Sequence, residues 1–308
     1  MNEIDLKESV RQWLINNLPY DRNDQALCAE LQEKDARELL IVYHNWMSRH
    51  VRPVPRTVRK SQAFTSNPIV QQRASDLAVI IQDIEQGRDL TRYLSRGIKT
   101  VADSASKPLN RRRDLDLMLN DWNVHHLHIS TQLEADGFVK RDGPLMFAAF
   151  QPNVAFLIDV MQHGDWTREH VIRVIADEWP DEGIIHEIKG NDRYKVVGLA
   201  VKYTEKEHQE LRAAGINVLC EIDGRVFMPG GGMVSVGTTV RASRAADQLL
   251  MELEKFETFV RNNPDQMREA FVQHGVQYPD EPRFEFVFLH PEGYGVVETV
   301  TKTLIPLA

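Results

Sequence analysis

Cysteine is scarce in this chain, and long apolar runs are missing. The two cysteines, Cys28 and Cys220, lie far apart and belong to no motif, so we expect reduced thiols and a cytoplasmic location. The first ten residues lack the basic-then-apolar pattern of a secretory signal. No apolar run approaches the roughly 18 residues that a membrane span requires. These absences argue against a disulfide-stapled secreted domain, and we expect no interaction with a membrane.

The composition predicts a folded core with an acidic overall charge. The 308 residues are 42% hydrophobic and 27% charged, which is ordinary for a globular protein. The formal net charge of −8 argues against a protein that coats nucleic acid. Local basic patches can still bind phosphates, because salt screening leaves mainly nearby charges to act.

Two basic regions interrupt this acidic background. The first runs from Arg49 to Lys60 without an acidic residue, and the second runs from Arg88 to Arg113. We predict that they contact nucleic-acid phosphates through Arg52, Arg56, Arg59, Lys60, Arg92, Arg96, Arg111, Arg112 and Arg113. The alternative is that these side chains form only the solvated faces of helices.

Helical periodicity dominates the first part of the chain. Apolar residues recur at helical spacing over residues 4–18, 24–48 and 68–86, whereas strand patterns begin after residue 120. The sequence therefore predicts an α+β protein. A helical region would cover residues 1–120, and an α+β domain with an antiparallel meander would cover residues 121–308, with a candidate sub-boundary near residue 190.

The stretch from 121 to 166 holds a histidine cluster and the most apolar part of the chain. A strand is expected over 124–131, and strand alternation places His126 and His128 on one face, opposite His125. Apolar runs at 145–150 and 154–161, joined by a Pro-Asn turn, predict a hairpin that completes a three-stranded meander.

Histidine suits acid–base chemistry because its pKa lies near neutral pH. We predict that His126 and His128 act as general base and general acid on a phosphodiester, and that Arg141 stabilises the charge of the phosphate. Asp159, at the end of the last strand, would orient a histidine, and His163 in the following turn would join the site. This chemistry requires no cofactor.

Two alternatives use the same residues differently. His126 and His128 could bind a divalent metal ion together with Asp159 or His163, although no cysteine and no second His-x-His motif supports a metal site. In the other alternative, the histidines are hydrogen-bonded structural residues of the strand.

Residues 180–189 contain the letters of a metal-dependent nuclease motif. Asp181, Glu187 and Lys189 follow the order of the PD-(D/E)xK nucleases, in which two acids hold a metal ion and the lysine assists the attacking water. Only five residues separate Asp181 from Glu187, which is short for a hairpin that brings both to one ion. Asp159 could replace Asp181, so the alternative metal ligands are Asp159 and Glu187.

Mixed elements are expected after residue 190. The patterns predict a strand at 194–203, a helix with a capping box at 204–214 and a hairpin over 216–228. A Gly-rich loop at 229–239 precedes a helix, where backbone N–H groups can bind phosphate, although the lysine of a P-loop is absent. Helices at 240–262 and 264–274 and a final hairpin of strands 283–290 and 294–305 complete the chain.

The piece that carries Arg141, the apolar run 145–150 and residues 156–163 resembles the core of RelE/HigB-type toxins. That family presents basic and histidine side chains on a small antiparallel sheet and cleaves mRNA without a metal ion. The resemblance covers residues 123–166 and implies ribonuclease activity in a bacterial defence or toxin–antitoxin setting, with Arg141 and His163 at matching places. The chain departs from the family in its length, its acidic charge and its histidine cluster.

These patterns predict cleavage of nucleic acid, RNA above all, by histidine acid–base chemistry. A non-catalytic protein that binds nucleic acid or regulates a protein partner is the rival from another class. A homo-oligomer also stays open.

Overall fold

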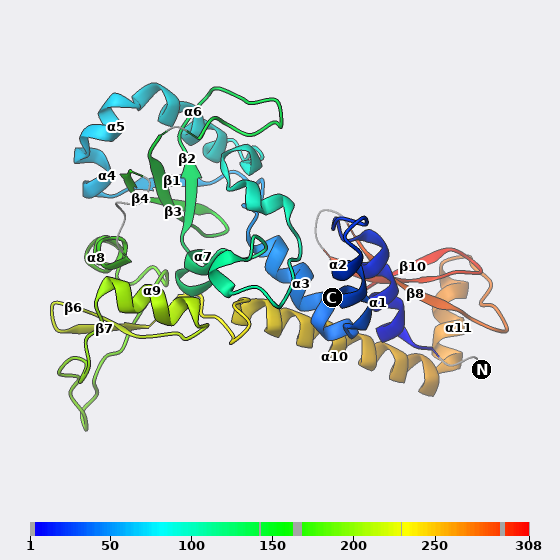
Figure 1. The fold of residues 1–308 in the computed structure, drawn as a ribbon. Helices are drawn as coiled ribbons and strands as arrows, with labels where there is room; N and C mark the ends of the chain where they lie inside the picture. Colours follow the sequence, from blue (N-terminus) through cyan, green and yellow to red (C-terminus); the bar gives the residue numbers. More distant parts are fainter. Residues whose placement is uncertain (1–3, 142, 163–167, 229, 290–292, 308) are drawn as a thin grey trace. The chain divides into compact units, whose positions relative to one another are not determined.

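The chain forms an α+β protein, as the sequence predicts (Figure 1). The computed structural model describes residues 4–141, 143–162, 168–228, 230–289 and 293–307. Two compact units are present: unit 1 comprises Met1–His44 with Ala242–Ala308, and unit 2 comprises Asn45–Arg241. We expected a boundary near residue 120, but that residue lies within unit 2. Unit 1 joins the two ends of the chain, which local sequence patterns do not reveal.

Unit 1 combines helices with a C-terminal sheet. It contains α1 (Leu6–Asn17), α2 (Gln25–Glu33), most of α3 (Ala36–Ser48) and α10 (Val240–Asn262), α11 (Pro264–Gln273), and strands β8 (Phe284–Phe288), β9 (Tyr294–Glu298) and β10 (Thr303–Leu307). The three strands are antiparallel in the order β10-β9-β8. The hydroxyl of Ser9 in α1 accepts a hydrogen bond from the backbone N–H of Phe286, at 2.8 Å, which ties the first helix to the last sheet.

Two expected elements of unit 1 are each divided in two. The helix predicted at 24–48 is interrupted after Glu33, because Asp35 and Glu38 cap a new helix reciprocally. Their side chains accept hydrogen bonds from each other's backbone N–H groups, at 2.8 and 3.0 Å. The strand predicted at 294–305 is likewise two strands, and Lys302 adopts a left-handed conformation, with φ of 59°, in the turn between them.

A four-stranded sheet forms the centre of unit 2. Its order is β1-β4-β3-β2, with β1 (Thr57–Lys60), β2 (His125–His128), β3 (Leu145–Phe150) and β4 (Val154–Met161). The antiparallel β2-β3-β4 meander confirms the prediction. Strand β1 lies within the first basic region, where no strand was predicted, and pairs in parallel with β4.

Both faces of this sheet are covered by helices (Figure 1). Phe147 and Phe156 belong to one hydrophobic core, which α8 (Arg168–Glu178) covers. Leu127, Met146 and Leu157 face the other core, which includes residues of α4 (Gln62–Ser66) and α6 (Ala74–Glu85). Burial of each such large apolar side chain contributes about 2 kcal/mol. Because both faces are covered, a polar side chain on this sheet lies against protein unless it is near an edge.

Between β1 and the meander, the chain is helical in short pieces. α5 (Pro68–Gln72) precedes α6, and three 3-10 helices follow: Thr91–Tyr93, Arg96–Lys99 and Leu109–Arg111. The helix predicted at 68–86 is thus split at Arg73. Helix α7 (Leu117–Trp122) then leads into β2, and Asn123 ends it in a left-handed conformation, with φ of 59°. This short helix places the residues before β2 beside the first strand of the meander.

The second sheet of unit 2 is small. Strands β5 (His186–Glu187), β7 (Arg225–Met228) and β6 (Cys220–Ile222) are antiparallel in that order. Helix α9 (Glu205–Ala213) begins with the predicted capping box of Thr204 and Glu207. The strand predicted at 194–203 is wrong, because no strand is assigned to this segment and Val197 is 92% exposed. Its β-branched residues favour a strand, but over the described ranges no other strand pairs with it.

The Gly-rich loop packs against α7. The backbone N–H groups of Gly231 and Gly232 both donate to the carbonyl of Asp121, at 3.1 and 2.9 Å. A Cβ atom on Gly230 would lie 1.9 Å from the carbonyl oxygen of Ile184. The glycines therefore permit close backbone contact, and these two N–H groups are already used within the protein rather than directed at a phosphate. Among the described helices, none has the length and apolar character needed to cross a bilayer.

Candidate active site

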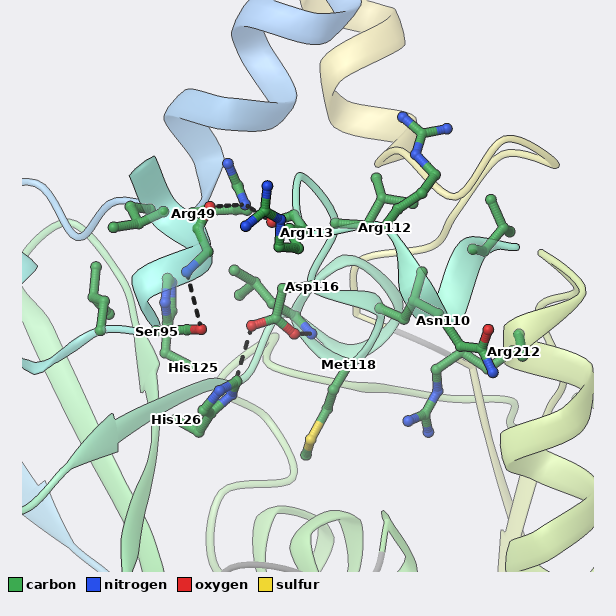
Figure 2. A pocket seen from close by; sticks show the side chains of 18 of the residues that line it. Arg49, Ser95, Asn110, Arg112, Arg113, Asp116, Met118, His125, His126 and Arg212 are labelled. Carbon is green, nitrogen blue, oxygen red and sulfur yellow. Dashed lines mark hydrogen bonds and ion pairs between the residues drawn. The ribbon is translucent and has the colours of Figure 1, made fainter. Parts of the chain in front are cut away.

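A pocket with a volume of about 450 Å³ lies in unit 2 where the 95–119 segment meets β2 and α9 (Figure 2). Four arginines (Arg49, Arg112, Arg113 and Arg212) and two histidines (His125 and His126) contribute to its lining. Leucines and Met118 form the apolar part of the wall. Small-molecule sites are typically of this size and combine apolar walls with a few polar groups. It is therefore our candidate for the functional site.

His126 and Asp116 form a pair within this pocket. Nδ1 of His126 lies 3.5 Å from Oδ2 of Asp116, and the two side chains are 25% and 22% exposed. Asp116 is held in place because its Oδ1 caps α7, accepting from the backbone N–H of Leu119 at 3.1 Å. A proton on Nδ1 facing this carboxylate leaves the lone pair of Nε2 available to a substrate. The arrangement is that of a general base with an orienting carboxylate.

Two of the arginines are fixed within the protein. Arg49 is buried and donates to the carbonyls of Gly97 and Arg113, at 3.0 and 3.1 Å, while its Nε has no hydrogen-bond partner among the residues that the structure describes. Burial lowers the pKa of Arg49. Arg212 contacts Asp121 at 3.2 Å, and within the described part of the chain its buried Nη2 has no hydrogen-bond partner. Arg49 therefore brings positive charge to the pocket wall, whereas Asp121 compensates the charge of Arg212.

The other two arginines differ in exposure, because the Arg112 side chain is only 11% exposed whereas Arg113 is exposed. Arg112 forms two hydrogen bonds to Asp114, at 3.0 and 2.6 Å, which compensate its charge. Arg113 is exposed, and no carboxylate of the described residues lies within ion-pair distance of its guanidinium. Figure 2 shows Arg49, Arg112 and Arg113 together on one side of the pocket, with Asp116 between them and His126. Arg113 is therefore the arginine of this group most available to an anion.

His125 faces away from His126, as strand alternation predicts. It is buried, with its ring in edge contact with Phe150 at 5.4 Å between centroids. Burial lowers the pKa of His125 to about 4. It is therefore neutral near pH 7 and serves as a packed side chain of the strand.

The low pKa of His125 makes stability depend on pH. The unfolded chain binds this proton near pH 6.5 and the folded protein only near pH 4, so stability is lost as the pH falls between these values. The shift corresponds to about 3 kcal/mol. The wild-type protein should therefore lose unfolding free energy between pH 7 and pH 4. In His125→Leu this loss should be smaller by about 3 kcal/mol, measured by urea denaturation. An unchanged pH dependence in this variant would contradict the assignment.

Asp159 forms a pair with His170. Its Oδ2 lies 2.6 Å from Nε2 of His170, and its Oδ1 accepts from Nδ2 of Asn67 at 2.7 Å. Burial by itself would raise the pKa of Asp159, but hydrogen bonds from His170, Asn67 and the backbone N–H of Val160 outweigh it and lower this pKa. The carboxylate does orient a histidine, but that histidine is on α8.

Strand register keeps Asp159 away from His126. Across the sheet, His126 pairs with Phe147 and Phe147 pairs with Asp159, so the fully buried Phe147 stands between them. Two interstrand spacings separate their Cα atoms by about 9.6 Å. Asp159 is not part of the pocket lining, and neither is the half-buried His128. His163 lies outside the described residues. We expected His126, His128, Asp159 and His163 to lie together. Of the three that the structure describes, only His126 lines the pocket.

Arg141 is linked to the pocket through Ser95. Its Nη2 donates to the hydroxyl of Ser95, which lines the pocket, at 3.3 Å. Burial lowers the pKa of Arg141. Arg141 itself is not in the lining.

The alternative metal ligands Asp159 and Glu187 lie in different sheets. Glu187 accepts hydrogen bonds from Arg225, at 3.2 and 2.9 Å, and these lower its pKa. Asp159 is bound as described above. Over the ranges that the structure describes, no three His, Cys, Asp or Glu side chains are placed to hold one metal ion.

Most of the predicted phosphate contacts already have partners within the chain. Arg56 is buried and donates to the carbonyls of Gln151, Arg52 and Val54. Four others are paired with acids: Arg59 with Glu182, Arg92 with Asp83, Arg96 with Glu134 and Asp136, and Arg112 with Asp114. Arg52, Lys60, Arg111 and Arg113 are exposed. Of these nine residues, Arg112 and Arg113 line the pocket.

Sequence reasoning missed Asp116, Arg49, Arg212 and His170. Asp116 carries a recognisable signal, because an Asp directly before the apolar run of α7 is a typical N-cap. Arg49 was noted only as part of a basic run. Arg212 and His170 are single residues on helices and form no local motif. The sequence matches no family model, and comparison with curated proteins and with solved structures likewise gives no match.

Proposed function

We propose that this pocket cleaves phosphodiester bonds of RNA by metal-independent acid–base chemistry. The observation that carries the proposal is the His126–Asp116 pair in the wall of a pocket lined by four arginines. A neutral imidazole supplies a base near pH 7, and the arginines favour a polyanionic ligand.

In this reaction Nε2 of His126 accepts the proton of a ribose 2′-hydroxyl, and the 2′-oxygen attacks the adjacent phosphorus. The bond from phosphorus to the 5′-oxygen breaks, and the leaving oxygen takes a proton from water. The products are a 2′,3′-cyclic phosphate and a free 5′-hydroxyl, and the imidazolium returns its proton to solvent. Arg113, together with the buried charge of Arg49, would stabilise the negative charge that accumulates on the phosphate oxygens.

This scheme changes the roles expected from the sequence. His126 keeps the role of general base, whereas Asp116 replaces Asp159 as the orienting carboxylate. Arg113 takes the role given to Arg141, which would act indirectly through Ser95. The resemblance of residues 123–166 to RelE/HigB-type toxins rests on Arg141 and His163, which this scheme does not use, and it contributes to the proposal only a toxin–antitoxin or antiviral setting.

The test is an assay with labelled single-stranded RNA and DNA of one sequence, in EDTA and in Mg²⁺. We expect RNA cleavage in both buffers, products with 2′,3′-cyclic phosphate ends, and no cleavage of DNA, which lacks the 2′-hydroxyl. Cleavage that requires Mg²⁺ would contradict the proposal. Salt-sensitive binding without cleavage would favour the rival, a nucleic-acid-binding protein.

A further inference from the structure

The two sides of the pocket differ in chemistry. Leu94, Leu117, Met118 and Leu145 contribute apolar surface, and Met118 and Leu145 are buried. Arg49, Arg112, Arg113 and Asp116 provide polar groups on another part of the wall, and Arg212 lies apart from them (Figure 2). A nucleotide has the same division, since its base is flat and largely apolar and its phosphate is anionic. Apolar surface next to a cationic group suits a base and its phosphate together.

The size of the pocket limits which nucleic acids can use it. A cavity of about 450 Å³ accommodates one small ligand. In a duplex the bases are stacked and paired, so a nucleotide must leave the stack before its base can enter a pocket that holds one small ligand. Protein recognition of RNA bases likewise favours unpaired loops and ends.

We infer that the pocket binds one unpaired nucleotide, with its phosphate at Arg113 and its base against Leu117 and Met118. This inference rests on the proposed function and adds the substrate class: single-stranded RNA, in loops or at ends, is bound and duplex RNA is excluded. Arg113 provides the phosphate contact because it is exposed and, among the described residues, has no carboxylate partner.

Binding can be measured separately from cleavage. The His126→Asn variant, in EDTA, is titrated against a labelled single-stranded RNA octamer and against a blunt duplex containing the same strand, with fluorescence anisotropy as readout. We expect the single strand to bind at least about tenfold more tightly, a difference of about 1.4 kcal/mol. Uridine monophosphate should displace the octamer at lower concentration than uridine, because only the former has the phosphate.

Two charge-matched variants locate the binding site. Leu117 is half-buried at the first position of α7, where a glutamate suits the helix N-terminus, and it lines the pocket. Leu133 is 55% exposed and is not part of the lining. In the His126→Asn background, Leu117→Glu should weaken octamer binding by about tenfold or more, whereas Leu133→Glu, with the same change in charge, should alter it less than about twofold.

A third variant tests the phosphate contact. Binding of the RNA octamer should weaken as salt rises. In Arg113→Met, the magnitude of the slope of log binding constant against log salt concentration should be smaller by about 0.7, the value for one phosphate of a single strand. The inference is overturned if duplex and single strand bind equally, or if Leu117→Glu and Leu133→Glu have equal effects, while the wild-type protein cleaves RNA. If the wild-type protein neither cleaves nor binds RNA, the proposed function itself is wrong.

Discussion

Replacing His126 with asparagine should lower the rate of RNA cleavage by about 10²- to 10⁴-fold, the range that a positioned general base contributes. Asparagine keeps a polar side chain of similar size but cannot accept a proton near pH 7. Because His126 is partly exposed at the pocket wall, the substitution should leave the fold intact. The measurement is the single-turnover cleavage rate of labelled RNA, together with the thermal melting temperature.

The matched control is His128→Asn, two residues along the same strand face. His128 is also half-buried but does not line the pocket, so we expect a cleavage rate within about threefold of wild type.

Asp116→Asn should give a loss of cleavage rate between those of the two histidine variants, because it removes the orienting carboxylate and keeps the base. Equal losses in the two histidine variants would show that the pocket does not determine the chemistry. A lowered melting temperature in His126→Asn would assign that histidine to the fold.

Replacing Arg212 with methionine should lower the free energy of unfolding by about 3–5 kcal/mol. Arg212 in α9 and Asp121 at the end of α7 are only 7% and 1% exposed, and they lie 3.2 Å apart. Removal of the guanidinium leaves a buried carboxylate without its counter-charge. Urea denaturation followed by circular dichroism measures the change. If the slope of unfolding free energy against urea concentration is the same as in wild type, only stability differs.

A surface ion pair on the same helix supplies the comparison. Lys206 and Glu210 of α9 are 85% and 64% exposed and 3.8 Å apart. Lys206→Ala should change the unfolding free energy by less than about 0.5 kcal/mol, because exposed pairs contribute little. If both substitutions have the same small effect, the Arg212–Asp121 pair is not desolvated and its arginine is not held as the structure indicates.

The meander could be predicted because its information is local. Alternation along residues 125–128 and the two apolar runs with their Pro-Asn turn specify strands and register, since a one-residue slip would invert the faces. The same alternation correctly separated His125 from His126. Local patterns failed where a strand needs a distant partner. Strand β1 pairs with β4, whereas residues 194–203 have strand-forming residues but, in the part of the chain that the structure describes, no partner strand.

The candidate site could be predicted only in part. The sequence indicated His126 and predicted that Asp159 lies near it. In the structure, strand register places Phe147 between these two residues. The basic residues looked like one phosphate-binding surface. Most are instead bound by carboxylates or backbone carbonyls, and these partners can lie far away in the chain, as Glu182 does from Arg59.

By itself, the sequence determined the α+β class, the central meander and the face on which each histidine of β2 lies, because these depend on side-chain periodicity over a few residues. Tertiary structure alone decided which charges meet: Asp116 with His126, His170 with Asp159, and Arg212 with Asp121. Such contacts form between elements brought together by burial of apolar surface, and nothing in the local pattern of either element specifies the partner.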